Sequence, residues 1–258
     1  MRMMSSLAGL AVVLTFAPAA SAQEDVDKPR AADPAITAAG AGDYLPQTLS
    51  ARVATTPAFA YGSGGYDSAH RGPLIDSAVE VAVWGPFAIR AQASYSNDTD
   101  RMRPSVAGRV QLLRQERHGV DGSLTVFFKT EGFTETEGEI ETFASVGHRF
   151  EQLSVVGNLV YGQDPEANER DGEVHASVFH QRGWLLYGFD SRVRFAIGTQ
   201  HGRAATTEPV FDFTGGPLAV AATGPVALFA QAGPSAFELA GSSTRWGVAM
   251  LAGLGGAY

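Results

Sequence analysis

The sequence predicts an all-β protein whose strands close into a transmembrane, antiparallel up-and-down β-barrel of about 12 strands. Three observations support this fold class. The gaps between candidate strands alternate between short and long, the candidate strands alternate apolar with polar residues, and aromatic residues stand near the strand ends. In a transmembrane barrel, short turns lie at one rim, long loops at the other and aromatic girdles at both.

The alternation of gap lengths runs along the whole predicted barrel. Each short gap separates two runs of alternating character and is typical of a tight hairpin turn. The short gaps are Gly85-Pro86, Gln115 to Gly119, Glu151-Gln152, Arg182-Gly183 and Gly224-Pro225. The long polar gaps are 67–75, 97–104, 131–136, 163–171, 199–208 and 233–244. A soluble sandwich has no physical reason to sort its loops in this way.

The strands between these gaps are amphipathic with a period of two residues. In segment 87–96, Phe87 and Ile89 share one face, whereas Arg90 and Gln92 share the other. A shift of one residue would move the charged side chains into lipid, so the register is strongly specified. The predicted strands are 57–66, 76–84, 87–96, 103–114, 119–130, 137–149, 153–162, 171–181, 184–198, 209–222, 226–232 and 245–258. Barrels of about ten or about fourteen strands stay as alternatives, because the first, tenth and eleventh segments are the least regular.

A secreted soluble β-sandwich is the main alternative fold, because it also alternates apolar and polar residues along each strand. Aromatic residues near turns and strand ends favour the membrane barrel, where they would form interfacial girdles. These residues are Trp84, Tyr95, Phe150, Tyr161, Trp184, Phe213, Trp246 and Tyr258. The apolar stretch 218–232 is broken by Gly224-Pro225 into two pieces too short for a helical span, so we expect two lipid-facing strands with small lumenal side chains.

The N-terminus predicts export from the cytoplasm. Residues 1–22 combine Arg2, an apolar segment from Leu7 to Ala20 and the small residues before Gln23, which is typical of a secretory signal peptide cleaved after Ala22. An uncleaved membrane anchor is the alternative. Residues 23–56 are rich in Ala, Asp, Pro and Gly and predict a flexible periplasmic lead segment. Residues 57–258 then form one barrel domain.

Composition excludes several classes of function. The 258 residues include no cysteine, which excludes disulfides and thiol-ligated metal sites. The formal net charge is −8, and the chain has no basic tract, so nucleic acid is not an expected partner. The histidines His148, His175, His180 and His201 show no ligand spacing. We therefore expect no metal and no cofactor.

Together these features resemble a bacterial outer-membrane β-barrel protein, at the level of architecture and over residues 57–258. In that class the last strand ends in an aromatic residue preceded by apolar residues at every second position. Here Trp246, Val248, Met250, Ala252, Leu254 and Tyr258 match this phase, and Gly256 departs from it. The resemblance implies an outer-membrane location, contact with membrane lipid, and recognition of the last strand by the barrel-insertion machinery. It specifies no particular family and no oligomeric state.

The inward phase of the strands predicts a lumen of mixed charge. The candidate lumen-lining residues are Glu80, Arg90, Arg109, Asp121, Lys129, Glu137, Glu139, Glu141, Arg149, Glu173, His175, Asp190, Arg192, Arg194 and Arg245. Such a lumen is either a narrow polar pore or a salt-bridge network that plugs and stiffens the barrel. The predicted function is a small passive channel or a structural membrane protein, not an enzyme.

A lipid-acting hydrolase is the enzymatic alternative. His175 and Ser177 alternate onto one face with Glu173, and the His-x-Ser pair is similar to one found on a barrel strand of some outer-membrane lipases. In such a pair the imidazole acts as a base toward the hydroxyl. Those enzymes carry the pair on the lipid side and commonly have Asn after the Ser. Here Val178 follows, and the pair lies opposite the apolar face, which favours a polar lumenal network instead.

Overall fold

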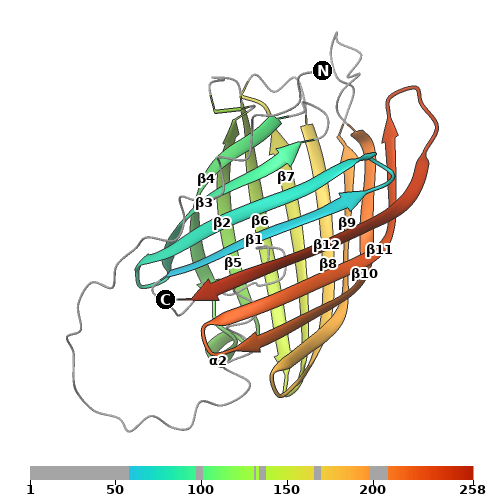
Figure 1. Cartoon of the computed structure of the whole chain (residues 1–258). Helices are drawn as coiled ribbons and strands as arrows, with labels where there is room; N and C mark the ends of the chain where they lie inside the picture. Colours follow the sequence, from blue (N-terminus) through green and yellow to red (C-terminus); the bar gives the residue numbers. More distant parts are fainter. Residues whose placement is uncertain are drawn as a thin grey trace, which may run out of the picture. The chain divides into compact units, whose positions relative to one another are not determined.

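The computed structural model describes residues 58–96, 101–130, 132–133, 138–165, 170–197 and 209–257 (Figure 1). The predicted signal peptide and almost all of the lead segment lie outside the described residues. The strands are β1 (Ala58–Asp67), β2 (Gly72–Trp84), β3 (Phe87–Ser96), β4 (Arg101–Leu113), β5 (Asp121–Thr130), β6 (Gly138–Phe150), β7 (Leu153–Gln163), β8 (Arg170–Arg182), β9 (Leu185–Ala196), β10 (Pro209–Thr223), β11 (Val226–Leu239) and β12 (Arg245–Ala257). One short helix, α2 (Gln115–His118), joins β4 to β5.

The strands form a closed barrel. Each strand pairs antiparallel with its neighbours in the chain, and β12 returns to pair with β1 from Phe59 opposite Ala257 to Asp67 opposite Ala249. Closure leaves no strand edge in the sheet, so the backbone donors and acceptors of every strand find partners within the wall. The predicted fold class, an antiparallel up-and-down barrel of about 12 strands, is confirmed.

One rim carries tight turns, as predicted. The connections 85–86, 151–152, 183–184 and 224–225 define this short-turn rim, which appears at the bottom of Figure 1. Gly85, Gly183 and Gly224 each adopt a φ between 54° and 59°, a left-handed conformation that primed hairpin turns require and that glycine adopts without strain. The fifth connection was predicted as a simple turn over 115–119. It contains helix α2 instead, capped by Gly119 in the left-handed conformation.

The opposite, long-loop rim differs from the prediction at two places. The predicted gap 67–75 is only the turn 68–71, because β2 begins at Gly72. The predicted gap 233–244 is also too long, because β11 continues to Leu239. The Gly233-Pro234 pair suggested a loop, but Pro234 stays aligned with Val248 of β12, and that pairing carries the strand onward.

The continuation of β11 depends on a close approach of two glycines. Gly216 of β10 lies opposite Gly233 of β11, where a Cβ on Gly233 would come within 2.0 Å of the Gly215 carbonyl oxygen. The adjacent prolines, Pro217 and Pro234, donate no backbone hydrogen bond. The register between β10 and β11 shows no paired residues from Gly215 to Pro217 and resumes at Leu218. Local irregularity between two strands is therefore compatible with a continuous barrel wall.

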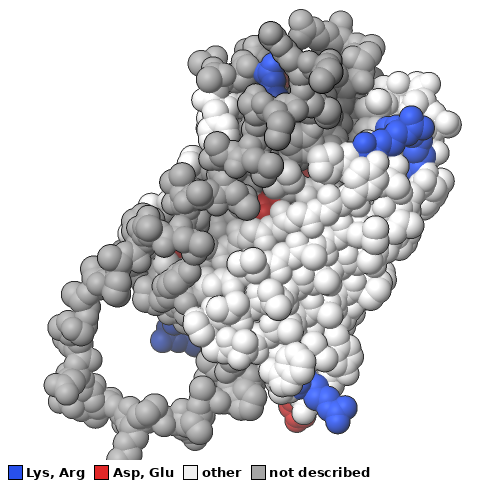
Figure 2. Space-filling model, in the orientation of Figure 1, with Lys and Arg blue, Asp and Glu red and all other residues white. Residues whose placement is uncertain are grey.

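The outer surface of the barrel is apolar. Leu159 is 62% exposed, Leu228 59% and Trp84 75%, all on outward positions of their strands. In the face shown in Figure 2, Lys and Arg lie at the two ends of the barrel, and the surface between them carries no such charge. Large exposed aromatic residues stand at both rims, with Trp84 and Trp184 at the short turns and Trp246 beside the long loops. This surface is what a lipid bilayer would cover.

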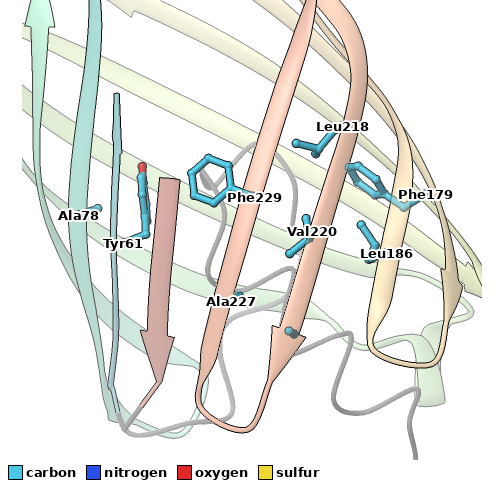
Figure 3. Packing of buried hydrophobic residues seen from close by; sticks show 9 residues of the cluster. Tyr61, Ala78, Phe179, Leu186, Leu218, Val220, Ala227 and Phe229 are labelled. Atoms are coloured by element: carbon cyan, nitrogen blue, oxygen red, sulfur yellow. The ribbon is translucent and has the colours of Figure 1, made fainter. Parts of the chain in front are cut away.

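The interior is not uniformly polar. Figure 3 shows a buried apolar cluster on the inner face, contributed mainly by β8 to β11 and β1. Its members are Tyr61, Ala78, Phe179, Leu186, Leu218, Val220, Ala222, Ala227 and Phe229. The expectation of small lumenal side chains over 218–232 is thus wrong, because Leu218, Val220 and Phe229 point inward. A strand that is apolar on both faces loses its alternation, and its inward residues cannot be identified from the pattern.

The apolar belt generates the first testable prediction. Replacing Leu159, in the middle of the outward face of β7, by Arg should destabilise the barrel by about 2–4 kcal/mol in lipid, because a guanidinium at the bilayer midplane loses its hydration. Reversible urea unfolding in lipid vesicles measures the change. Gln152→Arg, at an exposed short turn, is the matched control and should cost less than about 1 kcal/mol. Equal stability of both variants would contradict lipid contact at Leu159.

Candidate functional site

The candidate site is the inner face of the barrel, where buried charged side chains from neighbouring strands meet. Antiparallel pairing places inward residues of adjacent strands side by side, so residues far apart in the sequence join common networks. Three networks can be distinguished among the described residues. They are named here after Glu80, Glu139 and His70.

The Glu80 network lies on the inner face of β1 to β4. The Glu80 carboxylate accepts from Arg90 Nη1 and from Arg109 Nη1, each at 3.4 Å. The three side chains are at most 2% exposed. Arg90 also donates to the Tyr61 hydroxyl at 3.1 Å, and Tyr61 donates to Asp76 at 2.5 Å. One carboxylate thus holds two guanidinium groups together inside the wall.

The Glu139 network lies on β4 to β6. Glu139 Oε2 stands 3.7 Å from both Arg103 Nη2 and Lys129 Nζ. Lys129 also forms an ion pair with Glu141. These acidic and basic side chains alternate in space, so the charges largely neutralise one another. Continuing around the barrel, Arg194 of β9 pairs with Asp171 and lies 3.7 Å from Glu173 on β8.

The His70 network ties the turn 68–71 to the inner face. His70 Nδ1 lies 2.8 Å from Asp67 Oδ2, and its Nε2 lies 3.5 Å from Asp212 Oδ2 on β10. Ser235 of β11 donates to the other oxygen of Asp67 at 2.7 Å, and Arg192 pairs with Asp212 at 3.0 Å. The imidazole also packs on the Phe237 ring, with centroids 4.3 Å apart. The turn is therefore bound to strands across the β1–β12 closure.

The electrostatics of His70 follow from these contacts. Burial alone would lower the pKa of its imidazole, but the hydrogen bonds and charges of Asp212 and Asp67 outweigh burial and raise that pKa to about 9. His70 is therefore protonated at neutral pH and bridges two carboxylates as a cation.

The backbone of the turn is held as closely as its side chain. Ser68 exchanges hydrogen bonds with Val248 of β12, and Ala69 donates its backbone N–H to Asp67 Oδ1 at 2.8 Å. A Cβ on Gly247 would come within 2.4 Å of the Ala69 nitrogen, so the turn fits over β12 because that position is glycine. The turn is a folded part of the inner surface and not a free loop.

Some predicted lumen residues lie apart from the three networks. Asp121 accepts from the Gln115 backbone and the Gln111 side chain near α2. Arg149 contacts Gln115 through its backbone, and the Arg245 guanidinium stacks over the Phe237 ring at 4.8 Å. Asp190 accepts from Ser177. Glu137 lies outside the described residues.

Several members of the networks were not among the predicted residues. They are Tyr61, Asp67, His70, Asp76, Arg103, Asp171 and Asp212. Arg103, Asp171 and Asp212 share the inward phase of their strands, so the alternation could have identified them. Asp67 and His70 could not be found in this way, because they lay in a predicted loop.

The hydrolase alternative gains no support from the geometry. His175 Nε2 contacts Glu173 at 2.8 Å, whereas Ser177 donates its hydroxyl proton to Asp190. Both residues are buried on the inner face. A serine that donates to a carboxylate and not to the imidazole is not activated as a nucleophile. Within the described ranges no cluster of His, Asp or Glu could hold a metal ion, and no helix is long and apolar enough to cross a membrane.

Comparison with solved structures supports the fold. The NanC porin superposes with a TM-score of 0.58 at 8% identity, covering 77% of this chain and 100% of the porin chain. The KdgM porin superposes with a TM-score of 0.51 at 6% identity, covering 78% and 99%. At these identities the likeness establishes the barrel architecture alone. No family model matches the sequence, and no curated protein matches it.

The Glu80 network generates a stability prediction. Glu80→Gln removes the carboxylate shared by Arg90 and Arg109 and should destabilise the barrel by about 3 kcal/mol or more, since breaking a buried ion pair strands charge in a poorly solvated site. Urea unfolding in detergent micelles measures the loss. Glu151→Gln at an exposed turn is the control and should change stability by less than about 0.5 kcal/mol. A Glu80→Gln barrel as stable as this control would refute the role of the network.

His70 predicts a pH dependence of stability. Its folded pKa of about 9 exceeds the ordinary value of 6.5, so its contribution is complete below about pH 6.5 and is lost as the pH rises through 9. The loss should reach at most about 3 kcal/mol. Unfolding measured from pH 6 to pH 10 should show this fall in the native protein, and His70→Gln should remove it. The same slope in both proteins would assign the pH dependence to another group.

Proposed function

We propose that this chain is an outer-membrane β-barrel that acts as a small passive channel. The observation that carries the proposal is the contrast between its two surfaces, an apolar exterior and an interior with buried ion-pair networks. A soluble barrel has no need of an apolar exterior. A barrel that only anchors a protein in lipid has no need of so many inward charges, since each charge costs free energy to bury.

The similarity to two porins supports the same proposal. Their printed names identify them as porins, and each superposes over nearly its whole length on this chain. The resemblance of the final strand to strands read by the barrel-insertion machinery supports assembly in the outer membrane after cleavage of the predicted signal peptide. Membrane lipid would then be the partner of the outward residues.

A structural membrane protein is the second candidate, and one observation favours it. Inward side chains such as Arg90, Thr125 and Asn158 are at most 2% exposed, which indicates a filled interior. A filled barrel would stiffen the membrane protein without conducting. The two candidates differ in whether the filling can be displaced, and conductance distinguishes them.

Planar-bilayer recording of the purified protein tests the channel. We expect discrete conductance steps with weak preference between cations and anions, because acidic and basic side chains alternate along the inner face. The reversal potential in a salt gradient measures that preference. Folded protein that gives no steps, both in its native form and with the altered lead segment described below, would contradict the channel and favour the structural role.

A further inference from the structure

A continuous band of buried residues runs around the inside of the barrel. The ladder joins its members from strand to strand, with Glu80 opposite Arg90, Arg109 opposite Thr125, Ser145 opposite Asn158, and Val220 opposite both Leu186 and Phe229. Every one of the twelve strands contributes a buried residue. The band consists of Tyr61, Ala78, Glu80, Arg90, Arg109, Thr125, Ser145, Asn158, Ser177, Leu186, Val220, Phe229 and Gly255.

The wall alone does not explain this burial. Inward side chains just fill a barrel of about eight strands, and a barrel with more strands is wider. Ser145 on β6 and Gly255 on β12 stand six strands apart in the closed order of twelve, which places them on opposite sides of the lumen. Both are buried although neither side chain extends far from the wall. Additional polypeptide between them accounts for the burial.

The geometry of the chain identifies the segment that can reach this space. β1 begins at Ala58 on the short-turn rim, and Tyr61 of the band follows after one turn of the pleat. Residues 23–57 therefore join the barrel next to the buried band. The other segments outside the described ranges, 97–100, 131, 134–137, 166–169 and 198–208, connect strands at the opposite rim.

Length and composition of residues 23–57 fit the lumen. An extended chain spans at most about 3.3 Å per residue, so this segment can cover roughly 115 Å. That is more than twice the length of the longest strand, which at about 3.3 Å per residue is roughly 50 Å. The segment carries Ile36, Tyr44, Leu45, Leu49 and Val53 among small residues. These side chains match the apolar inner cluster around Val220 and Phe229.

We propose that residues 23–57 fold back into the barrel from the short-turn rim and plug the lumen, against the inner cluster on one side and the Glu80 network on the other. The plug replaces the expectation of a free periplasmic lead segment. It also deepens the proposed function, because a channel closed by its own N-terminal segment conducts only when that segment leaves. The two claims are tested by separate readouts.

Thiol labelling tests the plug directly. The chain has no cysteine, so Thr125→Cys introduces a single thiol into the band. Thr125 is 1% exposed, and its hydroxyl makes no hydrogen bond among the described residues, so the substitution removes no contact. The probe is a water-soluble maleimide. The comparison is with the same variant in which residues 24–56 are replaced by a Gly/Ser sequence of equal length, which keeps the chain but removes its apolar side chains.

We expect the Gly/Ser replacement to speed labelling of the Cys at position 125 by about tenfold or more, which corresponds to at least about 1.4 kcal/mol of lost protection. Arg182→Cys at the exposed short-turn rim is the control and should label at the same rate in both backgrounds. Circular dichroism should show the same strand content throughout. Equal labelling of the Cys at position 125 in both backgrounds would overturn the plug and assign the burial to a loop of the opposite rim or to the wall.

Conductance separates failure of the plug from failure of the channel. If both proposals hold, the Gly/Ser replacement raises the open fraction in a planar bilayer. Faster labelling without conductance would support the plug and contradict the channel. Unchanged labelling with conductance in the native protein would support the channel and contradict the plug.

Discussion

Closure of the sheet is the constraint on which the rest of the structure depends. In lipid no water is available to satisfy a strand edge, so every backbone donor and acceptor must pair within the wall. The β1–β12 ladder meets this demand by joining the first strand to the last. Closure then fixes which residues point outward and which inward, because side chains alternate along each strand. The apolar belt and the charged interior are both consequences of that one ladder.

The interior combines two kinds of packing that rarely share one surface. On β2 to β9, buried carboxylates and guanidinium groups neutralise one another, whereas Leu218, Val220 and Phe229 form an apolar patch on β10 and β11. Buried ion pairs cost desolvation and hold only with good geometry. The apolar patch adds hydrophobic burial that such pairs do not supply. The division gives the lumen one face suited to charges and one suited to apolar side chains.

Much of this architecture could be predicted from the sequence, and the failures have physical causes. The alternation identified inward residues such as Arg90 and Glu139 wherever one face was polar. It failed over 218–232, where both faces are apolar, and at Gly233-Pro234, where pairing with β12 overrode two residues that usually end strands. Tertiary contacts also hid the role of His70, since a short polar turn gives no sign that it folds inward onto Asp212.

The most direct test of the account is the electrophoretic mobility of the protein in the outer-membrane fraction, compared with and without boiling. A closed barrel resists detergent until heat breaks its ladder, because it offers no edge from which to open. The account predicts that the unheated protein remains in that fraction as a compact, faster-migrating band that shifts on boiling. A protein recovered in the soluble fraction with no heat-dependent shift would contradict the membrane barrel and the interpretation of its lumen.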